Sequence, residues 1–321
     1  MSVAARWVSG SASAALFDVV TARPAEARVL VAGAAAVYLQ VGEAARVVAV
    51  VARDGVALPN AVVVSALARS APFAQVAPRQ VARIGAGRIE IHGMVVQVHR
   101  WWDPVPRLPT ADPAVLATRL IEVQRLLEPW PYDEVDPVGI AVRERAMALA
   151  TAAAALRVDA AARAAVALVG LGPGFTPSGD DIVAGFLSGL RLLPEACRTP
   201  MLGGDRLAGT LAKAVSEAVA GASMRTTAPS AALLAHAARG EVARPAGRLL
   251  AALVGAAPIG GAVQELLGVG HTSGLDLATG LVIAGKSVVA GIEGKVSTAR
   301  SNALIHNARL EHVRVPCALH R

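Results

Sequence analysis

Two stretches of the chain, Ser178-Gly-Asp-Asp-Ile-Val-Ala-Gly185 and Ser273-Gly-Leu-Asp-Leu-Ala-Thr-Gly280, share the spelling S-G-x-D-x-x-x-G. Each follows a glycine-rich loop and opens an apolar run that is too long for a strand. In each copy the serine is expected to cap a helix, and the aspartate three residues later, Asp181 or Asp276, is expected to complete a capping box. The glycine that ends each stretch predicts close packing of the two helices, because glycine inside a helix costs about 1 kcal/mol relative to alanine.

The two helix starts are also the candidate binding site. Free backbone N–H groups at a helix start favour an anion, so two adjacent starts would form a pocket for a small anion. Arg225 is added because a guanidinium group binds phosphate or carboxylate through two hydrogen bonds; the alternative is that it satisfies loop carbonyl groups. The residues assigned to substrate or anion binding are Gly172, Gly174, Thr176, Ser178, Gly179, Arg225, Thr226, Thr227, Thr272, Ser273 and Gly274.

Two further residues are candidates for catalysis. Asp180 is the candidate functional carboxylate, because Asp181 is assigned to the helix cap. His271 lies beside the second helix start, and the alternative for it is an exposed loop histidine. The loop Gly170-Leu-Gly-Pro-Gly174 lacks the Lys-Ser/Thr ending of a Walker A loop and does not fit G-x-G-x-x-G, which argues against a nucleotide site. The two cysteines belong to no metal-binding pattern, so neither a metal nor a cofactor is expected.

Composition narrows the class of protein. The chain has 321 residues, of which 54% are hydrophobic and 3% aromatic, so its elements are expected to pack through small side chains. The net charge of +7 comes from scattered arginines with no aromatic residues interleaved, which argues against nucleic acid as a partner. The apolar stretch from Leu277 to Ile292 is interrupted by Lys286 and is shorter than the roughly 20 residues of a membrane span. No signal peptide is recognisable, so the cytoplasm is the expected location.

The hydrophobic period changes once along the chain. Short β-rich runs separated by turn formers predict strands at residues 28–32, 37–41, 46–51, 61–64, 88–92 and 95–99. Strands at this spacing indicate a small antiparallel sheet or a barrel. Helical periods follow at 113–127, 138–156, 158–169, 181–193, 205–220, 230–239, 248–254, 263–267 and 275–284. The predicted fold is α+β: an N-terminal antiparallel β-rich domain (1–105), a mainly helical domain with the site (106–292), and a polar, irregular tail (293–321) that is expected to be disordered.

Three segments of the chain resemble a known family. They are residues 168–190, which contain the specific string G-P-G-x-T-P-S-G-D-D, then Arg225-Thr-Thr-Ala-Pro-Ser-Ala-Ala-Leu-Leu234 followed by Ala238-Arg-Gly-Glu241, and Gly270-His-Thr-Ser-Gly-Leu-Asp276. They are similar to the uncharacterised-domain family typified by AllH, a subunit of the three-component oxamate carbamoyltransferase of anaerobic allantoin degradation. The resemblance extends to Asp54–Val64 and the segment Trp102-x-Pro104, and so to most of the chain.

The resemblance implies a function in purine catabolism. The chain would work with an FdrA-like subunit of the acyl-CoA-synthetase type and a second uncharacterised-domain subunit. Together they would convert oxalurate and phosphate reversibly into oxamate and carbamoyl phosphate, and a carbamate kinase would then recover ATP. The alternative is a non-catalytic subunit that assembles the complex or senses a small anion.

Overall fold

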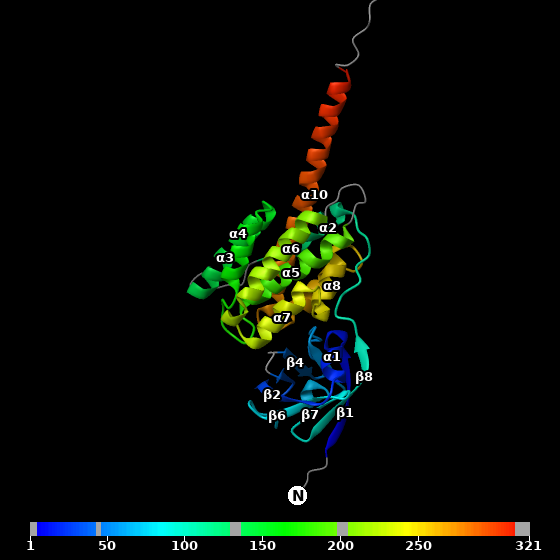
Figure 1. The fold of residues 1–321 in the computed structure, drawn as a ribbon, viewed down its shortest axis with the longest axis vertical. Coiled ribbons are helices and arrows are strands. Elements are labelled where there is room, and N and C mark those ends of the chain that lie inside the picture. Colours follow the sequence, from blue (N-terminus) through cyan, green and yellow to red (C-terminus); the bar gives the residue numbers. More distant parts are fainter. Residues whose placement is uncertain (1–4, 43–45, 129–135, 198–204, 312–321) are drawn as a thin grey trace, which may run out of the picture.

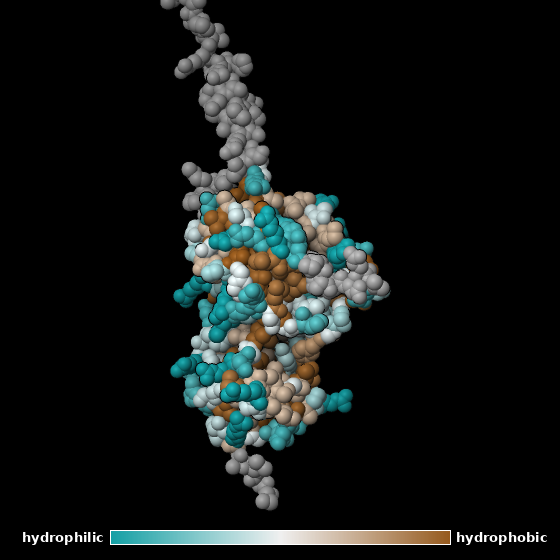
Figure 2. Space-filling model, turned by 180° about the vertical axis from the view of Figure 1, so that it is seen from behind, coloured by the Kyte–Doolittle hydropathy of each residue, from teal (hydrophilic) through white to brown (hydrophobic). Residues whose placement is uncertain are grey.

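The computed structural model describes residues 5–42, 46–128, 136–197 and 205–311, without the side chains of 205–207 and 295–311. A β-barrel forms one end of the molecule, and a bundle of helices stands on it (Figure 1). Seen from behind, hydrophobic side chains form a band along the helical part and gather at the narrowing above the barrel (Figure 2). The architecture is therefore α+β, as predicted.

The barrel is closed in the order β1-β5-β4-β3-β2-β6-β7-β8. Its strands are β1 (Arg6–Ser13), β2 (Ala25–Ala32), β3 (Ala36–Val41), β4 (Arg46–Val51), β5 (Ala61–Val64), β6 (Val81–Gly85), β7 (Arg88–Ile91) and β8 (Met94–Trp102). Helix α1 (Phe17–Thr21) follows β1 through the short helix η1 (Ala14–Leu16), and η2 (Ala68–Ser70) follows β5. Alternate residues such as Val29, Leu39 and Ile89 fill the interior, which is the packing expected of a small barrel.

The expectation of an antiparallel sheet is wrong at two strand pairs. β1 runs parallel to β8 and β4 runs parallel to β5, so the barrel is mixed. Strands β1 and β6 and helix α1 were not predicted either. β1 is rich in serine, alanine and glycine, which have weak strand propensity, and it is held by its partners β5 and β8.

The helical part begins after β8. Its helices are α2 (Pro113–Leu126), α3 (Pro137–Ala154), α4 (Val158–Leu168), α5 (Ser178–Ala196), α6 (Asp205–Gly221), α7 (Ala228–Ala238), α8 (Arg244–Leu253), α9 (Ile259–Leu267) and α10 (Ser273–Glu311), with the short helix η3 (Ser223–Arg225) before α7. Asp112 and Asp136 cap α2 and α3, and a proline follows each of them at the first helical position. Helices α5 and α10 lie at the centre of the bundle and supply much of its core.

Helix α10 is longer than the sequence predicted. The chain was expected to turn irregular after Ile292, whereas the helix continues to Glu311, in a segment without proline. Within the described residues, Ser273–Gly294 is long and apolar enough to cross a membrane, and 61% of its most apolar window is buried inside the fold. Leu281 and Ala284 are fully buried there, so this segment serves as a core helix.

Candidate functional site

Helices α5 and α10 cross at unusually close range near their N-termini. A Cβ atom at Gly185 of α5 would lie 2.1 Å from the carbonyl oxygen of Leu277, and one at Gly280 of α10 would lie 2.0 Å from the carbonyl oxygen of Ile182. Only glycine permits such an approach between backbones. This contact brings the first turns of the two helices side by side.

A second pair of glycines fixes each helix start against the helix before it. A Cβ atom at Gly179 would lie 2.1 Å from the carbonyl oxygen of Leu168, the last residue of α4. One at Gly274 would lie 1.8 Å from the carbonyl oxygen of Leu266 in α9. Gly179 and Gly274, two of the four glycines assigned to anion binding, are therefore required by packing.

Hydroxyl groups connect the two helix starts. The Thr176 Oγ1 atom lies 3.1 Å from the Ser273 Oγ atom, and the Ser178 Oγ atom lies 3.4 Å from the Thr272 Oγ1 atom. Both are within hydrogen-bonding distance. Four of the residues assigned to binding are thus brought together from positions far apart in the sequence.

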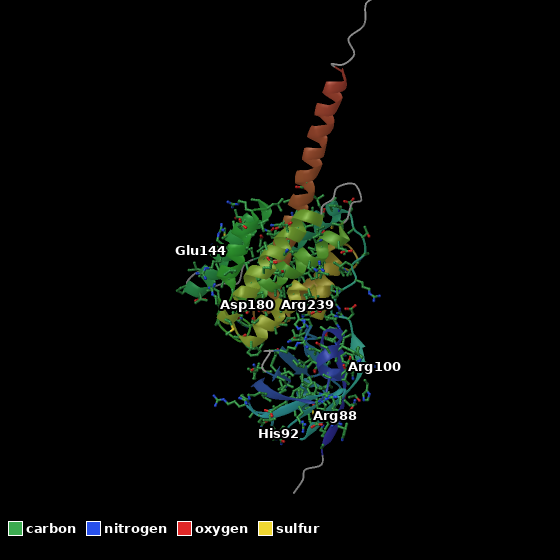
Figure 3. All side chains as sticks on the ribbon, viewed as in Figure 1. Arg88, His92, Arg100, Glu144, Asp180 and Arg239 are labelled. Carbon is green, nitrogen blue, oxygen red and sulfur yellow. The ribbon has the colours of Figure 1, made fainter. Side chains whose placement is uncertain are left out.

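Asp180 is a buried structural carboxylate, 1% exposed. Its Oδ1 atom accepts a hydrogen bond of 2.9 Å from the backbone N–H of Gly170, and its Oδ2 atom accepts one from the hydroxyl of Thr226. The neighbouring Thr227 donates to the carbonyl oxygen of Phe175 and caps α7 by accepting from the backbone N–H of Ser230. Asp180 therefore joins the start of α5 to the loop before it and to the start of α7. It is labelled in Figure 3, at the end of the helical part that faces the barrel.

Asp181 does not have the capping role that the sequence predicted. The N-cap of α5 is Pro177, which has no N–H group for a capping box, and no side chain caps this helix start. The predicted N-cap, Ser178, is the first residue of the helix itself. The carboxyl group of Asp181 instead accepts hydrogen bonds from the hydroxyls of Ser273 and Thr176.

The environment of Asp181 favours its neutral form. The residue is 5% exposed, and its Oδ2 atom has no hydrogen-bond partner among the described residues. Burial raises the pKa of this carboxyl well above its ordinary value; the hydrogen bonds from Ser273 and Thr176 lower it, and the nearby charges of Asp276 and Asp180 raise it. Asp276 is itself fully buried at the equivalent position of α10.

The backbone donors of the α5 start are largely occupied. The N–H group of Gly179 donates to the carbonyl oxygen of Leu171, and those of Asp180 and Asp181 donate to the carbonyl oxygen of Pro177. At the start of α10, the N–H group of Gly274 donates to Val269 and that of Asp276 to Thr272. Five of the N–H groups at the two helix starts are therefore occupied by bonds within the protein.

Three candidate residues are exposed to solvent. The guanidinium group of Arg225 is exposed and donates to the carbonyl oxygen of Val166 over 3.2 Å, which is the alternative left open for it above. Gly174 is exposed in the loop before α5, and His271 is exposed before α10. Gly172 is half-buried and packs against Ser178. Anion binding by these residues stays a prediction.

A cavity of about 300 Å³ lies between the barrel and the starts of α5 and α10. The helical part contributes Thr176, Asp181 and Ser273 to its polar end. The rest of the wall is mostly apolar and comes from both parts of the molecule, including Val51, Leu58, Ala184, Leu277 and Leu281. None of the described residues that line this cavity is a lysine, an arginine or a histidine.

One comparison with known proteins identifies the segment that builds this site. The family model described as oxamate carbamoyltransferase subunit AllH matches the chain from the end of α4 to the middle of α10. Residues 168–285 match the AllH family. Neither the curated proteins nor the solved structures yield a match to this chain.

The AllH match confirms the resemblance that the sequence motifs indicated, over a shorter range. It includes Asp181, Thr176 and Ser273, and it leaves out Asp54–Val64 and the barrel, to which the resemblance was expected to extend. The barrel nevertheless supplies part of the cavity wall.

Two cavity residues were missed by the sequence reasoning. Tyr38 of β3 packs edge-on against Phe175, with ring centroids 4.7 Å apart, and burial followed by the charge of Asp181 raises the pKa of its hydroxyl. Glu241 reaches the cavity from the loop after α7, where His236 and Arg239 hold its carboxylate. Burial alone would raise the pKa of Glu241, but these two partners lower it below its ordinary value. The sequence offered one signal for Tyr38, because the chain has only two tyrosines and a rare aromatic residue could have been singled out as a site candidate.

Proposed function

We propose that this chain is a subunit of a carbamoyltransferase that converts oxalurate and phosphate into oxamate and carbamoyl phosphate, and that its interdomain cavity holds the small substrate. The observation that carries the proposal is the coincidence of the AllH match with the elements around the polar end of the cavity. The match extends from the end of α4 through the start of α10, and so contains both helix starts.

The two helix starts support this assignment as an equivalent pair. Counting the serine of each motif as position one, the glycine at position eight of either helix packs on the carbonyl group at position five of the other. Asp181 and Asp276 then occupy the same position of the two motifs. A pseudo-symmetric pair of this kind places the buried carboxyl group of Asp276 near that of Asp181, which lines the cavity, and such a pair is suited to binding or proton transfer.

The proposed enzyme needs further subunits. We infer that the partners are an FdrA-like subunit and a second uncharacterised-domain subunit, that the complex works in the cytoplasm, and that the chain divides near residue 105 into a barrel domain and a helical domain. Phosphoryl-leaving chemistry depends on donors that face the developing negative charge. Because the wall of this cavity offers no basic side chain among its described residues, the donors for phosphate are expected to come from Arg225 or from a partner.

The test is reconstitution. The chain is purified alone and together with the two partner subunits, and phosphate-dependent release of oxamate and carbamoyl phosphate from oxalurate is measured. We expect turnover by the complex and none by the chain alone. Turnover by the chain alone would refute the requirement for partners, and an inactive, correctly assembled complex would refute the reaction.

The second candidate function is a non-catalytic subunit for assembly or anion sensing. The hydrogen bonds that occupy the backbone donors of the α5 start favour it, since they give these residues a structural role. A substitution that fills the cavity with a larger side chain distinguishes the catalytic function from the assembly function. A reconstituted complex that keeps full turnover with the cavity blocked supports the assembly role, and loss of turnover in an intact complex supports catalysis.

A further inference from the structure

The polar end of the cavity carries one unsatisfied group. Asp181 lines the cavity and is 5% exposed, and its Oδ2 atom has no hydrogen-bond partner among the described residues. A buried carboxyl oxygen without a hydrogen bond is unfavourable, because it has lost its contact with water and gained no partner. Such an atom at the wall of a cavity marks the place where a ligand's polar group belongs.

The surroundings of Asp181 decide which kind of group fits. The titratable residues that interact with it are Asp180 and Asp276 from α5 and α10 and Tyr38 from the barrel, and Glu241 from the loop after α7 lines the same cavity. All of them are neutral or negative, and the carboxylate of Glu241 is already held by Arg239 and His236. A second carboxylate would therefore be repelled at this end of the cavity.

The hydroxyls of Ser273 and Thr176 already donate to the carboxyl group of Asp181, which leaves its Oδ2 atom for one hydrogen bond with a ligand. A primary carboxamide suits this atom in either protonation state, because its nitrogen donates to a carboxylate oxygen and its carbonyl oxygen accepts from a protonated carboxyl. We propose that Asp181 binds the carboxamide end of oxamate in this cavity and exchanges a proton with its nitrogen atom. The choice of oxamate rests on the proposed function; the recognition of a carboxamide rests on the geometry of Asp181.

The proton exchange completes the reaction. In phosphorolysis a phosphate oxygen forms a bond to the ureido carbonyl carbon of oxalurate, and the bond from that carbon to the oxamate nitrogen breaks. The nitrogen keeps the electron pair of that bond and takes the carboxyl proton of Asp181. The carboxylate left on Asp181 recovers a proton from the attacking phosphate, which loses one as carbamoyl phosphate forms. The burial that raises the pKa of Asp181 keeps a proton available for this step.

Binding to the purified chain tests the recognition step. Calorimetric titration compares oxamate with oxalate and glycine, which keep one carboxylate but replace the carboxamide by a carboxylate or an ammonium group. We expect oxamate to bind at least about tenfold more tightly than either. Tighter binding of glycine would overturn the inference, since it would mean that Asp181 acts as an anion. Equal binding of oxalate would overturn it as well.

Two variants separate recognition from proton exchange. Asp181→Asn keeps a donor and an acceptor and is expected to bind oxamate within a few-fold of the wild type, whereas Asp181→Ala is expected to bind at least about tenfold more weakly. In the reconstituted complex, Asp181→Asn should lower kcat strongly with little change in KM. Asp136→Asn is the matched control, because Asp136 caps α3, asparagine caps a helix equally well, and the residue does not line the cavity; it should leave the preference for oxamate over oxalate unchanged.

The outcomes distinguish this inference from the proposed function. A complex that turns over oxalurate equally well with Asp181→Asn would leave the function intact and refute the proton exchange. The purified chain could also bind oxamate in a way that depends on residue 181 while the reconstituted complex has no turnover. That result would support the binding of the carboxamide by Asp181 and refute the proposed carbamoyltransferase reaction.

Discussion

Asp180 and Asp181 are adjacent acids with opposite roles, and the difference comes from where the helix turns each of them. Asp180 faces the loop and Thr226, where both of its oxygens are satisfied. Asp181 faces the other helix start, where burial and a neighbouring acid disfavour its charge. The predicted cap role of Asp181 is wrong, because the rule for a capping box treats the helix start as isolated. The catalytic role predicted for Asp180 stays a prediction.

The raised pKa of Asp181 makes a prediction about stability. Because the folded protein favours the neutral carboxyl, the stabilising contribution is complete below the ordinary pKa of 3.8 and is lost as the pH rises through the raised value. Asp181→Asn is neutral at every pH and should avoid that loss. We expect its melting temperature to equal or exceed that of the wild type at alkaline pH, with the advantage shrinking toward acid pH.

Thermal unfolding across this range of pH measures the effect. Asp180→Asn is the control, and it should be less stable than the wild type by about 1–3 kcal/mol, since it disturbs a hydrogen-bonded carboxylate. An Asp181→Asn protein that loses stability with rising pH as steeply as the wild type would show that the pH dependence originates elsewhere.

At the scale of elements, the crossing of α5 and α10 depends on two glycines. A Cβ atom at Gly280 would lie 2.0 Å from the carbonyl oxygen of Ile182, so Gly280→Ala must move the helices apart. Overpacking of this kind costs about 1–3 kcal/mol, which exceeds the gain of about 1 kcal/mol in helix propensity. We therefore expect Gly280→Ala to lower the free energy of unfolding in denaturant titrations.

Gly291 supplies the matched control on the same helix. The nearest atom to a Cβ there is 3.9 Å away, on Leu156, so Gly291→Ala should raise stability by about 1 kcal/mol. Gly185→Ala should resemble Gly280→Ala, and the double variant should cost less than the two single effects together, because either substitution already separates the helices. Additive effects would mean that the two contacts are independent.

The helices were predictable because capping residues and small-residue spacing lie within each helix or directly beside it. Asp112 and Asp136 with the prolines after them mark two starts, and the small-residue repeats of α5 and α10 indicate close packing. A barrel was one of the two predicted arrangements, but its closure by a parallel pair was not predictable, since the pairing of β1 with β8 joins the two ends of the β region. The cavity was missed for the same reason: Tyr38 and Asp181 belong to parts of the chain that no local pattern connects.

At the scale of the whole molecule, the barrel serves as one wall of the site. In β3, Val37 and Leu39 point into the barrel, so the alternate residues Ala36 and Tyr38 lie on its outer face. That face carries a small apolar cluster around Val51 and turns toward the helix starts. The space left between the two parts is therefore bounded by a rigid sheet on one side and by the crossed helices on the other.

Ala36→Leu tests whether this space is reserved for a ligand. The larger side chain would extend into the cavity and bury more apolar surface, so stability should stay the same or rise. Oxamate binding should weaken at least about tenfold, because the added atoms occupy the ligand's volume. Ala235→Leu is the matched control, since Ala235 lines a different groove, between the barrel and α7. Calorimetry and thermal unfolding measure both properties, and unchanged binding by Ala36→Leu would place the ligand outside the cavity. A gain in stability together with a loss of binding would indicate that the fold keeps this cavity open for its ligand at the expense of packing.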